Sequence, residues 1–253
     1  MAAIFWFRRD LRLQDNEALN KAAEHEDGLI HPVYLLDSTV FASLEGIRQH
    51  SLVESLRSLN KDMAGTLTVI SARDWQSSVA RLAILAEGVA AKRVFATRAF
   101  DPAGVAEQNA VGLALQALGI FLDLSGSYYA VTPGTVAKPD GSAYRVYTPF
   151  FKAWFESAQY ARPASLPTNV KFERLAPSEL PEPTKPAPFR VVAGEAFALR
   201  TFERFKARAI AGYHELRDRA DLSGTSHLSH ALAFGEIHPR TLLAQLGDSD
   251  GHN

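Results

Sequence analysis

The sequence predicts an α/β protein with a doubly wound, parallel, five-stranded sheet, followed by a linker and the truncated start of an all-α domain. Two observations predict this fold. Short β-branched or aromatic runs alternate with longer segments of helical periodicity, and a proline-rich stretch then separates this pattern from a purely helical one. Parallel strands need helical crossovers because a tight turn cannot join them.

Five short runs rich in β-branched and aromatic residues are the expected strands. They are Ala3 to Phe7, Leu29 to Leu36, Thr66 to Ile70, Arg93 to Thr97 and a weaker run at Gly119 to Leu124. Between them, apolar residues at helical spacing predict helices around Leu44 to Leu59, Val79 to Leu85 and Val105 to Leu118. We assign residues 1–160 to this first, α/β domain.

Proline marks the end of the first domain. Seven of the 13 prolines fall between Arg162 and Pro188, and because proline lacks an amide donor and fixes φ, we expect residues 161–193 to be an extended linker along the first domain. Apolar residues then follow a helical spacing, namely Phe197, Phe202, Phe205 and Ile210. We expect residues 194–253 to be the incomplete start of a helical domain in a truncated chain, since about 60 residues are too few for an independent core.

The composition excludes several kinds of protein. The chain has no cysteine, which excludes disulfides, thiolate metal sites and cysteine nucleophiles. No apolar run is long enough for a membrane helix and the N-terminus lacks the features of a secretory signal, so we expect a cytoplasmic protein with no membrane partner. Neither GxGxxG nor GxxxxGK[ST] occurs, which removes two common phosphate-binding loops.

The net charge of −1 lacks the basic excess of many nucleic-acid-binding proteins. The stretch from Arg200 to Arg219 is nevertheless locally basic, with six arginines and lysines against three acidic residues. Such a stretch contacts phosphates, or it is a solvated helix face with ion pairs. The charge pattern leaves both interpretations open.

Basic residues follow directly after the first predicted strand. Ile4 to Phe7 runs into Arg8 to Arg12 (RRDLR), and Asp15 and Asn16 then provide a helix start. Ligands of open α/β sheets bind at the carboxyl ends of the strands. We therefore expect these arginines to bind an anion or to contact the second domain, with structural ion pairs as the alternative.

Two further segments have simpler interpretations. Tyr144 to Trp154 (YRVYTPFFKAW) places aromatic residues at helical spacing, which is typical of core packing. His227, His230 and His238 have no nearby carboxylate pair or cysteine, so we expect no metal site and interpret them as polar surface or domain-contact residues.

The segment Gly224 to Ser229 (GTSHLS) carries the strongest ligand signal. Thr225 and Ser226 are good N-cap residues for a helix from His227 to Phe234, and Ser229 lies one turn further on. A helix N-terminus presents unpaired amides and partial positive charge, so these hydroxyls would suit a diphosphate. An ordinary capped helix is the alternative.

Three segments together resemble one family, the class I DNA photolyases and cryptochromes. FWFRRDLRLQDNEAL (Phe5 to Leu19) is similar to their opening signature, and YRVYTPFFKAW resembles their Y-x-V-[FY]-T-P-F-x-K-x-W element. GTSHLSHALAFGEIHPR resembles their flavin-domain motif GTSxLSxxLxxGxISPR. Order and spacing agree over essentially the whole chain.

The resemblance implies an FAD site and a DNA contact. Carried over residue by residue, the flavin contacts are Tyr213, Thr225, Ser226, His227, Leu228 and Ser229. Arg217 matches a position that faces the phosphates of damaged DNA in photolyases. Two positions depart from the motif, because His227 replaces an arginine or lysine and His238 replaces a serine. Backbone groups supply much of the diphosphate contact, so neither change should abolish binding.

The activity implied is that of a deoxyribodipyrimidine photolyase, a carbon-carbon lyase, or of its N-terminal fragment. In this family, reduced FAD excited by blue light donates an electron to a cyclobutane pyrimidine dimer flipped out of DNA. The lesion contacts and the tryptophan electron chain lie beyond Asn253 in relatives, so no catalytic residue is expected here. Trp6, Trp75 and Trp154 do not match that electron chain.

Relatives also bind an antenna chromophore in the first domain, either a deazaflavin or methenyltetrahydrofolate. Folate-type relatives have an Asn-Glu pair where this chain has Phe100 to Gly104, which weakens the folate option. The expected partner is DNA containing pyrimidine dimers, and the expected state is a monomer. The alternatives are a cryptochrome-type photoreceptor that signals through protein partners, and a product in which only the α/β domain folds and no flavin binds.

Overall fold

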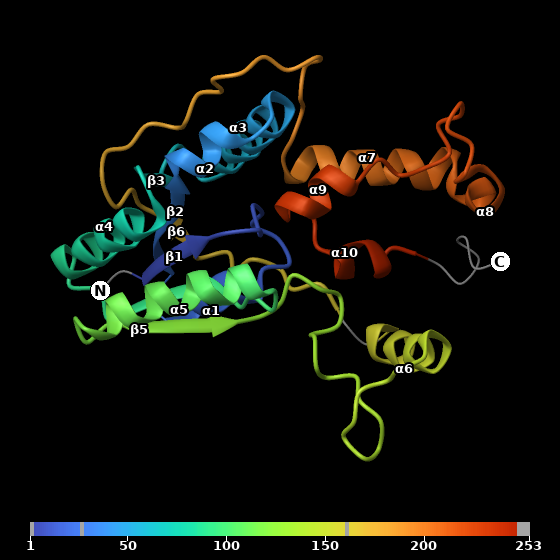
Figure 1. Ribbon diagram of the computed structural model, residues 1–253, viewed down its shortest axis with the longest axis horizontal. Coiled ribbons are helices and arrows are strands. Elements are labelled where there is room, and N and C mark those ends of the chain that lie inside the picture. The colour runs from blue at the N-terminus through green and yellow to red at the C-terminus, as the bar shows by residue number, and fades with distance from the viewer. Residues whose placement is uncertain (1–2, 26–27, 160–161, 247–253) are drawn as a thin grey trace.

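The computed structural model describes residues 3–25, 28–159 and 162–246 (Figure 1). The first part of the chain alternates strands and helices: β1 (Ala3–Phe7), α1 (Glu17–His25), β2 (Leu29–Asp37), α2 (Ser38–Ser43), α3 (Gly46–Asp62), β3 (Thr68–Ala72), α4 (Trp75–Gly88), β4 (Arg93–Thr97), α5 (Pro102–Gln116) and β5 (Phe121–Ser125). The second part contains α6 (Tyr147–Gln159), β6 (Lys171–Phe172), α7 (Glu195–Arg208), a 3-10 turn η1 (Ile210–Gly212), α8 (Tyr213–Leu216), α9 (Ser229–Phe234) and α10 (Pro239–Leu243). The predicted domain boundary at 160–161 and the final segment GDSDGHN lie outside the described residues.

The sheet confirms the predicted fold class. Its strands are parallel and follow the order β3-β2-β1-β4-β5. The strand β3 begins at Thr68 rather than at Thr66, because the Thr66 hydroxyl donates to the Met63 carbonyl in the preceding turn. The short strand β6, which the sequence does not predict, extends the sheet by pairing with Leu29 and Ile30.

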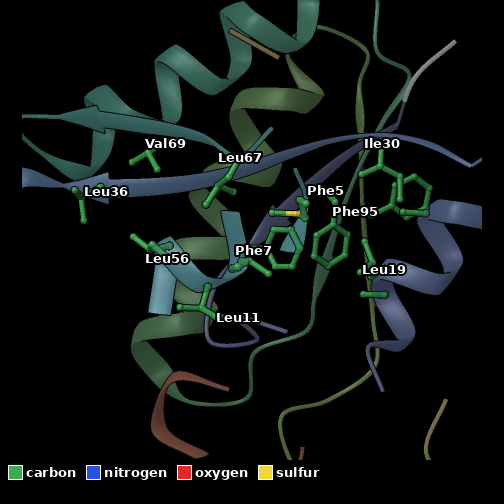
Figure 2. Close-up of a cluster of buried hydrophobic side chains, with 14 of the residues drawn as sticks. Phe5, Phe7, Leu11, Leu19, Ile30, Leu36, Leu56, Leu67, Val69 and Phe95 are labelled. Atoms are coloured by element: carbon green, nitrogen blue, oxygen red, sulfur yellow. The ribbon is translucent and has the colours of Figure 1, made fainter. Parts of the chain in front are cut away.

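Two apolar clusters cover the two faces of the sheet, which makes it doubly wound. Along β1, Phe5 and Phe7 point to the face covered by α1 and α3, whereas Ile4 and Trp6 point to the face covered by α4 and α5. Figure 2 shows Phe5, Phe7 and Phe95 packed together at the centre of the first cluster. The strand period of two thus buries every residue of β1.

Aspartates start three of the helices. Asp37, Asp74 and Asp101 precede α2, α4 and α5, and each carboxylate accepts a hydrogen bond from the backbone amide three residues further on. These bonds satisfy amides that have no partner inside the helix. Asn16 acts similarly before α1, because its side-chain oxygen accepts from the Leu19 amide at 3.1 Å.

The proline-rich stretch lies along the α/β domain. The Gln49 side chain accepts hydrogen bonds from the Thr184 and Lys185 amides, and Thr68 bonds to the backbone at Ala176. Between residues 162 and 193 the structure contains no helix. The division into domains at 160 and 193 stays a prediction.

The aromatic segment around α6 contradicts the prediction of core packing. Figure 1 shows α6 apart from the sheet, near α10. Tyr147 is 72% exposed and Phe151 41%, and the described side chains of α6 include none that is buried. The periodicity of the segment is helical as predicted, but no described element covers its apolar face.

The loop between β1 and α1, residues 8–16, holds the C-terminal helices against the α/β domain. The Leu11 amide donates to the Phe234 carbonyl at 3.1 Å, and the Arg12 guanidinium donates to the Gly235 carbonyl at the same distance. Glu195, at the start of α7, accepts from the amides of Leu13 and Gln14. These contacts tie the helical part to the first domain.

Gly235 allows the closest of these approaches. Its φ is 67°, in the left-handed region, where it ends α9. A Cβ atom at this position would lie 1.9 Å from the Arg9 carbonyl oxygen. Both the backbone conformation and the contact therefore require glycine.

Asp15 is the charged centre of the contact. Its carboxylate, 2% exposed, accepts from Arg240 Nε at 3.0 Å and from the Thr241 hydroxyl at 2.9 Å. Burial alone would raise the pKa of Asp15, but hydrogen bonds from His238, Arg240 and the Ala164 amide outweigh burial and lower it below its usual range. The ionised form is therefore the one that the folded protein stabilises.

We predict that Asp15→Asn destabilises the protein by about 2–4 kcal/mol at pH 7, because Arg240 loses the more buried of its two carboxylate partners and keeps only Glu17. Since the folded pKa is depressed, the contribution of Asp15 is complete above about pH 4 and is lost as the pH falls further. The difference in unfolding free energy between wild type and variant should thus shrink between about pH 4 and pH 2. Urea unfolding at several pH values measures it. A difference in unfolding free energy that stays constant with pH would contradict the depressed pKa of Asp15. Asn tolerates the positive φ of 52° at this position, so the substitution introduces no backbone strain.

Candidate functional site

A cavity of about 300 Å³ lies at the carboxyl ends of the central strands. The chain leaves β1 toward β2 on one side and reaches β4 on the other, so the gap between β1 and β4 is the topological switch point, where open α/β sheets bind ligands. Strand ends, the start of α4 and the β4–α5 connection line it: Trp6, Phe7, Arg8, Arg9, Tyr34, Leu35, Trp75, Ala99, Asp101, Ala103, Gly104, Glu107 and Tyr128.

Arg8 is the buried arginine of this cavity, and Arg9 is exposed at it. The Arg8 side chain is 6% exposed and lies over the Trp6 ring, 4.5 Å from the ring centroid. Its Nη2 donates to the Gly104 carbonyl at 2.7 Å and to Glu107 Oε2 at 3.0 Å. A Cβ atom on Gly104 would lie 3.3 Å from this Nη2, so the glycine leaves room for the guanidinium to reach the backbone.

Two buried donors at the cavity have no partner among the described residues. They are Arg8 Nη1 and Trp75 Nε1. A buried donor without an acceptor costs free energy, and such groups in native proteins often mark a ligand or water site. The centroid of the Trp75 ring lies 5.9 Å from that of the Trp6 ring. The two donors therefore lie beside aromatic side chains that line the cavity.

A buried carboxylate supports the loop that carries Arg8. Asp10 is fully buried and accepts from the Thr97 hydroxyl at 2.6 Å, from Asn16 Nδ2 at 3.2 Å and from the Arg8 amide at 2.8 Å. These bonds link the end of β1 to the end of β4 across the switch point. The position of Arg8 is therefore held by three elements.

Two tyrosines complete the walls with neutral phenols. Burial raises the pKa of Tyr34, and the charges of Glu107 and Asp10 raise it further. Burial and Asp10 likewise raise the pKa of Tyr128, whose hydroxyl donates to the Thr97 carbonyl at 3.3 Å. An aromatic cavity with two arginines and unpaired donors suits a planar heteroaromatic ligand that carries hydrogen-bond acceptors.

The predicted flavin residues lie in the C-terminal helices, away from this cavity. Tyr213 begins α8, and its ring meets Phe205 edge-on at 5.8 Å. Leu228 is buried in the small core of these helices. Thr225 and Ser226 are partly buried, whereas His227 and Ser229 are exposed.

The prediction that Thr225 and Ser226 cap a helix beginning at His227 is wrong. The helix α9 begins at Ser229, after Leu228, and has no side-chain cap. His227 has a φ of 54°, which is not helical, so the chain turns there before α9 starts. The role of Thr225 and Ser226 as flavin contacts stays a prediction.

The remaining predicted residues separate into contact and surface groups. His238 is 1% exposed, caps α10 by accepting from the Arg240 amide, and contacts the Ser127 carbonyl through Nε2. It is thus the N-cap residue of α10. His230 lies 3.4 Å from the buried Glu236. Arg217 is exposed, 3.7 Å from Asp218.

Of the arginines after β1, Arg8 and Arg9 line the cavity and Arg12 contacts the helical part. Arg8 also forms an ion pair with Glu107, the alternative that the sequence left open, and the binding of an anion stays a prediction. Tyr34, Trp75 and Tyr128 were missed, because nothing local marks them as neighbours. Within the described residues no cluster of three or more histidines and carboxylates is placed to hold a metal ion. In the same residues no helix has the length and apolarity to cross a bilayer.

Comparison with known proteins relates this fold to photolyases. The model of the DNA photolyase family matches residues 3–170. The deoxyribodipyrimidine photo-lyase of Agrobacterium fabrum is 34% identical over 250 residues, covering 93% of this chain and 51% of that protein. An uncharacterized 31.6 kDa protein in the atpI 5' region of Synechococcus is 27% identical, and there the match covers 95% of this chain and 87% of that protein.

Solved structures agree. A class III photolyase from Agrobacterium tumefaciens superposes with a TM-score of 0.79 at 28% identity, over 99% of this chain and 55% of that one. A Synechocystis cryptochrome (TM-score 0.80, 98% and 57% covered) and a Sulfolobus tokodaii photolyase with two FAD molecules (0.73, 96% and 54%) share the fold at 20% identity. The chain spans about half the length of the curated photolyases that it matches. It contains their N-terminal α/β domain, and it belongs to the DNA photolyase family.

Proposed function

We propose that this chain is the chromophore-binding N-terminal part of a deoxyribodipyrimidine photolyase, which uses blue light to repair cyclobutane pyrimidine dimers in DNA. The observation that carries the proposal is the aromatic cavity at the switch point, with Arg8 Nη1 and Trp75 Nε1 buried and unpartnered among the described residues. The identity of 34% to a deoxyribodipyrimidine photo-lyase supports the same assignment.

The cavity is suited to an antenna chromophore. Trp6, Tyr34 and Trp75 provide flat apolar surfaces, and the two free donors suit a ligand that can accept hydrogen bonds. Of the two antennas expected, a deazaflavin is the better match to a planar aromatic site. Methenyltetrahydrofolate is disfavoured, because Asp101 is engaged in capping α5 through the Gly104 amide. The Sulfolobus tokodaii photolyase holds two FAD molecules, with the implication of a novel light-harvesting cofactor in that protein.

The second cofactor we propose is FAD at the segment from Tyr213 to Ser229. The hydroxyls of Thr225 and Ser226 are partly accessible, and within the described residues neither forms a hydrogen bond to protein. They are thus free to donate to a diphosphate. Reduced FAD, when bound, supplies the electron that splits the pyrimidine dimer. The chain contributes binding and orientation, and the exposed Arg217 contributes a phosphate contact to the DNA.

We predict that Trp75→Phe weakens deazaflavin binding about tenfold, because it removes one donor and keeps the aromatic wall. The measurement is a fluorescence titration of the purified chain with 8-hydroxy-5-deazariboflavin. Trp154→Phe, the same change outside the cavity, is the matched control. Equal affinities for both variants and wild type would remove the cavity as the antenna site, and tighter binding of methenyltetrahydrofolate would reverse the choice of chromophore.

We predict that the double substitution Thr225→Ala with Ser226→Ala lowers FAD affinity by about tenfold or more, measured by quenching of FAD fluorescence. Ser157→Ala, exposed on α6 and outside this segment, should bind as wild type does. Unchanged FAD binding in the double variant would contradict the proposed diphosphate contact. Dimer-containing oligonucleotides under blue light then test the activity, since bound FAD with intact dimers would favour a cryptochrome-type photoreceptor.

We predict that Arg217→Ala weakens binding to a dimer-containing duplex and reduces the slope of log K against log salt by about 0.9, as expected for one lost phosphate contact. Electrophoretic mobility shifts at several salt concentrations measure the slope. Arg48→Ala, an exposed arginine on α3, should leave it unchanged. Identical slopes for both variants would place the DNA elsewhere.

A further inference from the structure

The cavity at the switch point is lined by tryptophan and tyrosine rings, namely Trp6, Tyr34, Trp75 and Tyr128. A tyrosine that loses an electron also loses its phenolic proton. Burial raises the pKa of both Tyr34 and Tyr128, which opposes the loss of that proton. The two indole rings are therefore the side chains of this cavity that most readily give up an electron.

A buried cation lies over one of these two indoles. The guanidinium carbon of Arg8 is 4.5 Å from the centroid of the Trp6 ring, the Arg8 side chain is 6% exposed, and Trp6 is 1% exposed. Among the described residues no cation is placed in this way over Trp75, although the centroids of the two indoles are only 5.9 Å apart. The neighbouring indoles therefore have different electrostatic surroundings.

The charge of Arg8 acts strongly on Trp6 because both side chains are shielded from water. Coulomb energies rise as the local dielectric falls, so a buried cation affects the ring beneath it more than an exposed one does. The counter-charge of Glu107 lies 3.0 Å from Arg8 Nη2, but the Glu107 side chain is 45% exposed and is screened more by water. Removal of an electron from Trp6 would place a second positive charge beside the guanidinium. The contact thus makes Trp6 harder to oxidise.

An oxidisable ring beside a light-absorbing ligand shortens the lifetime of the excited ligand. In this quenching step Trp6 would transfer one electron to the excited ligand and become an indole radical cation. No bond forms or breaks, and the electron later returns to Trp6. The absorbed energy is then lost as heat, so a site that holds light energy for transfer has to prevent this step.

We propose that Arg8 keeps Trp6 reduced while the ligand of this cavity is excited, so that the cavity preserves the excited state of its chromophore. Arg8 thereby tunes the photochemistry of the site through its charge. The inference rests on the antenna function proposed above and goes beyond it, because a chromophore can bind in the cavity whether or not Arg8 protects its excited state.

The experiment measures the fluorescence lifetime of 8-hydroxy-5-deazariboflavin bound to the purified chain at saturating ligand. Arg8→Gln should shorten the lifetime about threefold or more, because the cation over Trp6 is lost. Arg8→Lys keeps a positive charge and should stay closer to wild type. Addition of Trp6→Phe to Arg8→Gln should restore the wild-type lifetime, since phenylalanine is much harder to oxidise than tryptophan.

Two further variants separate the charge of Arg8 from its structural contacts. Glu107→Gln removes the counter-charge and leaves Arg8 in place, so the lifetime should be at least as long as in wild type, and a shorter lifetime would overturn the proposal. The matched control is Arg93→Gln, which removes a cation from over Phe121 outside the cavity and should leave the lifetime unchanged.

The results distinguish this inference from the antenna function itself. A wild-type lifetime in Arg8→Gln, or a short lifetime that Trp6→Phe does not restore, would overturn the role of Arg8 while ligand binding still supports the antenna site. A wild-type chain that binds no ligand would instead remove the antenna site, and this inference with it. Native circular dichroism of each variant ensures that a changed lifetime reports the charge and not unfolding.

Discussion

The buried ion pair between Asp15 and Arg240 is the interaction on which the arrangement of the two parts depends. Both side chains come from short segments that would otherwise be weakly held, a loop after β1 and the first turn of α10. Removing the Asp15 carboxylate costs about 2–4 kcal/mol, a large part of a typical folding free energy. The small core of the C-terminal helices is too limited to stand alone, so this pair and the neighbouring backbone bonds fix their place.

The loop at residues 8–16 also lines the cavity, through Arg8 and Arg9 at its start. Arg8 faces the switch point, Arg12 and Asp15 face the helices, and Asp10 lies between them with three hydrogen bonds. Each buried donor that lost this acceptor would cost about 1–3 kcal/mol. The position of the ligand cavity and the position of the helical part are therefore set by one stretch of nine residues, 8–16. This explains physically why a loop rich in arginine and aspartate is mostly buried.

The molecule has two kinds of apolar surface. The sheet faces and the strand β1 are closed by helices of the same chain, whereas α6 is apolar on a side that no described element covers. The cavity at the switch point belongs to the closed part.

The sequence by itself determined the strands, most helices and the order of the parts, because alternation and helical spacing are local properties of the chain. It also predicted that the arginines after β1 bind an anion or contact a second domain, with structural ion pairs as the alternative, and of these the second-domain contact of Arg12 and the ion pair of Arg8 are seen. Only the tertiary structure showed that Arg8 lines the cavity whereas Arg12 contacts the helical part. It also showed that Trp75 and Tyr128 line the same cavity as Arg8 at the switch point. The tertiary structure also showed that α9 begins at Ser229 and not at the predicted His227, and that the aromatic side chains of α6 are exposed. The reason is that burial and side-chain partners depend on which distant segments meet, and the spacing of residues along one segment does not contain that information.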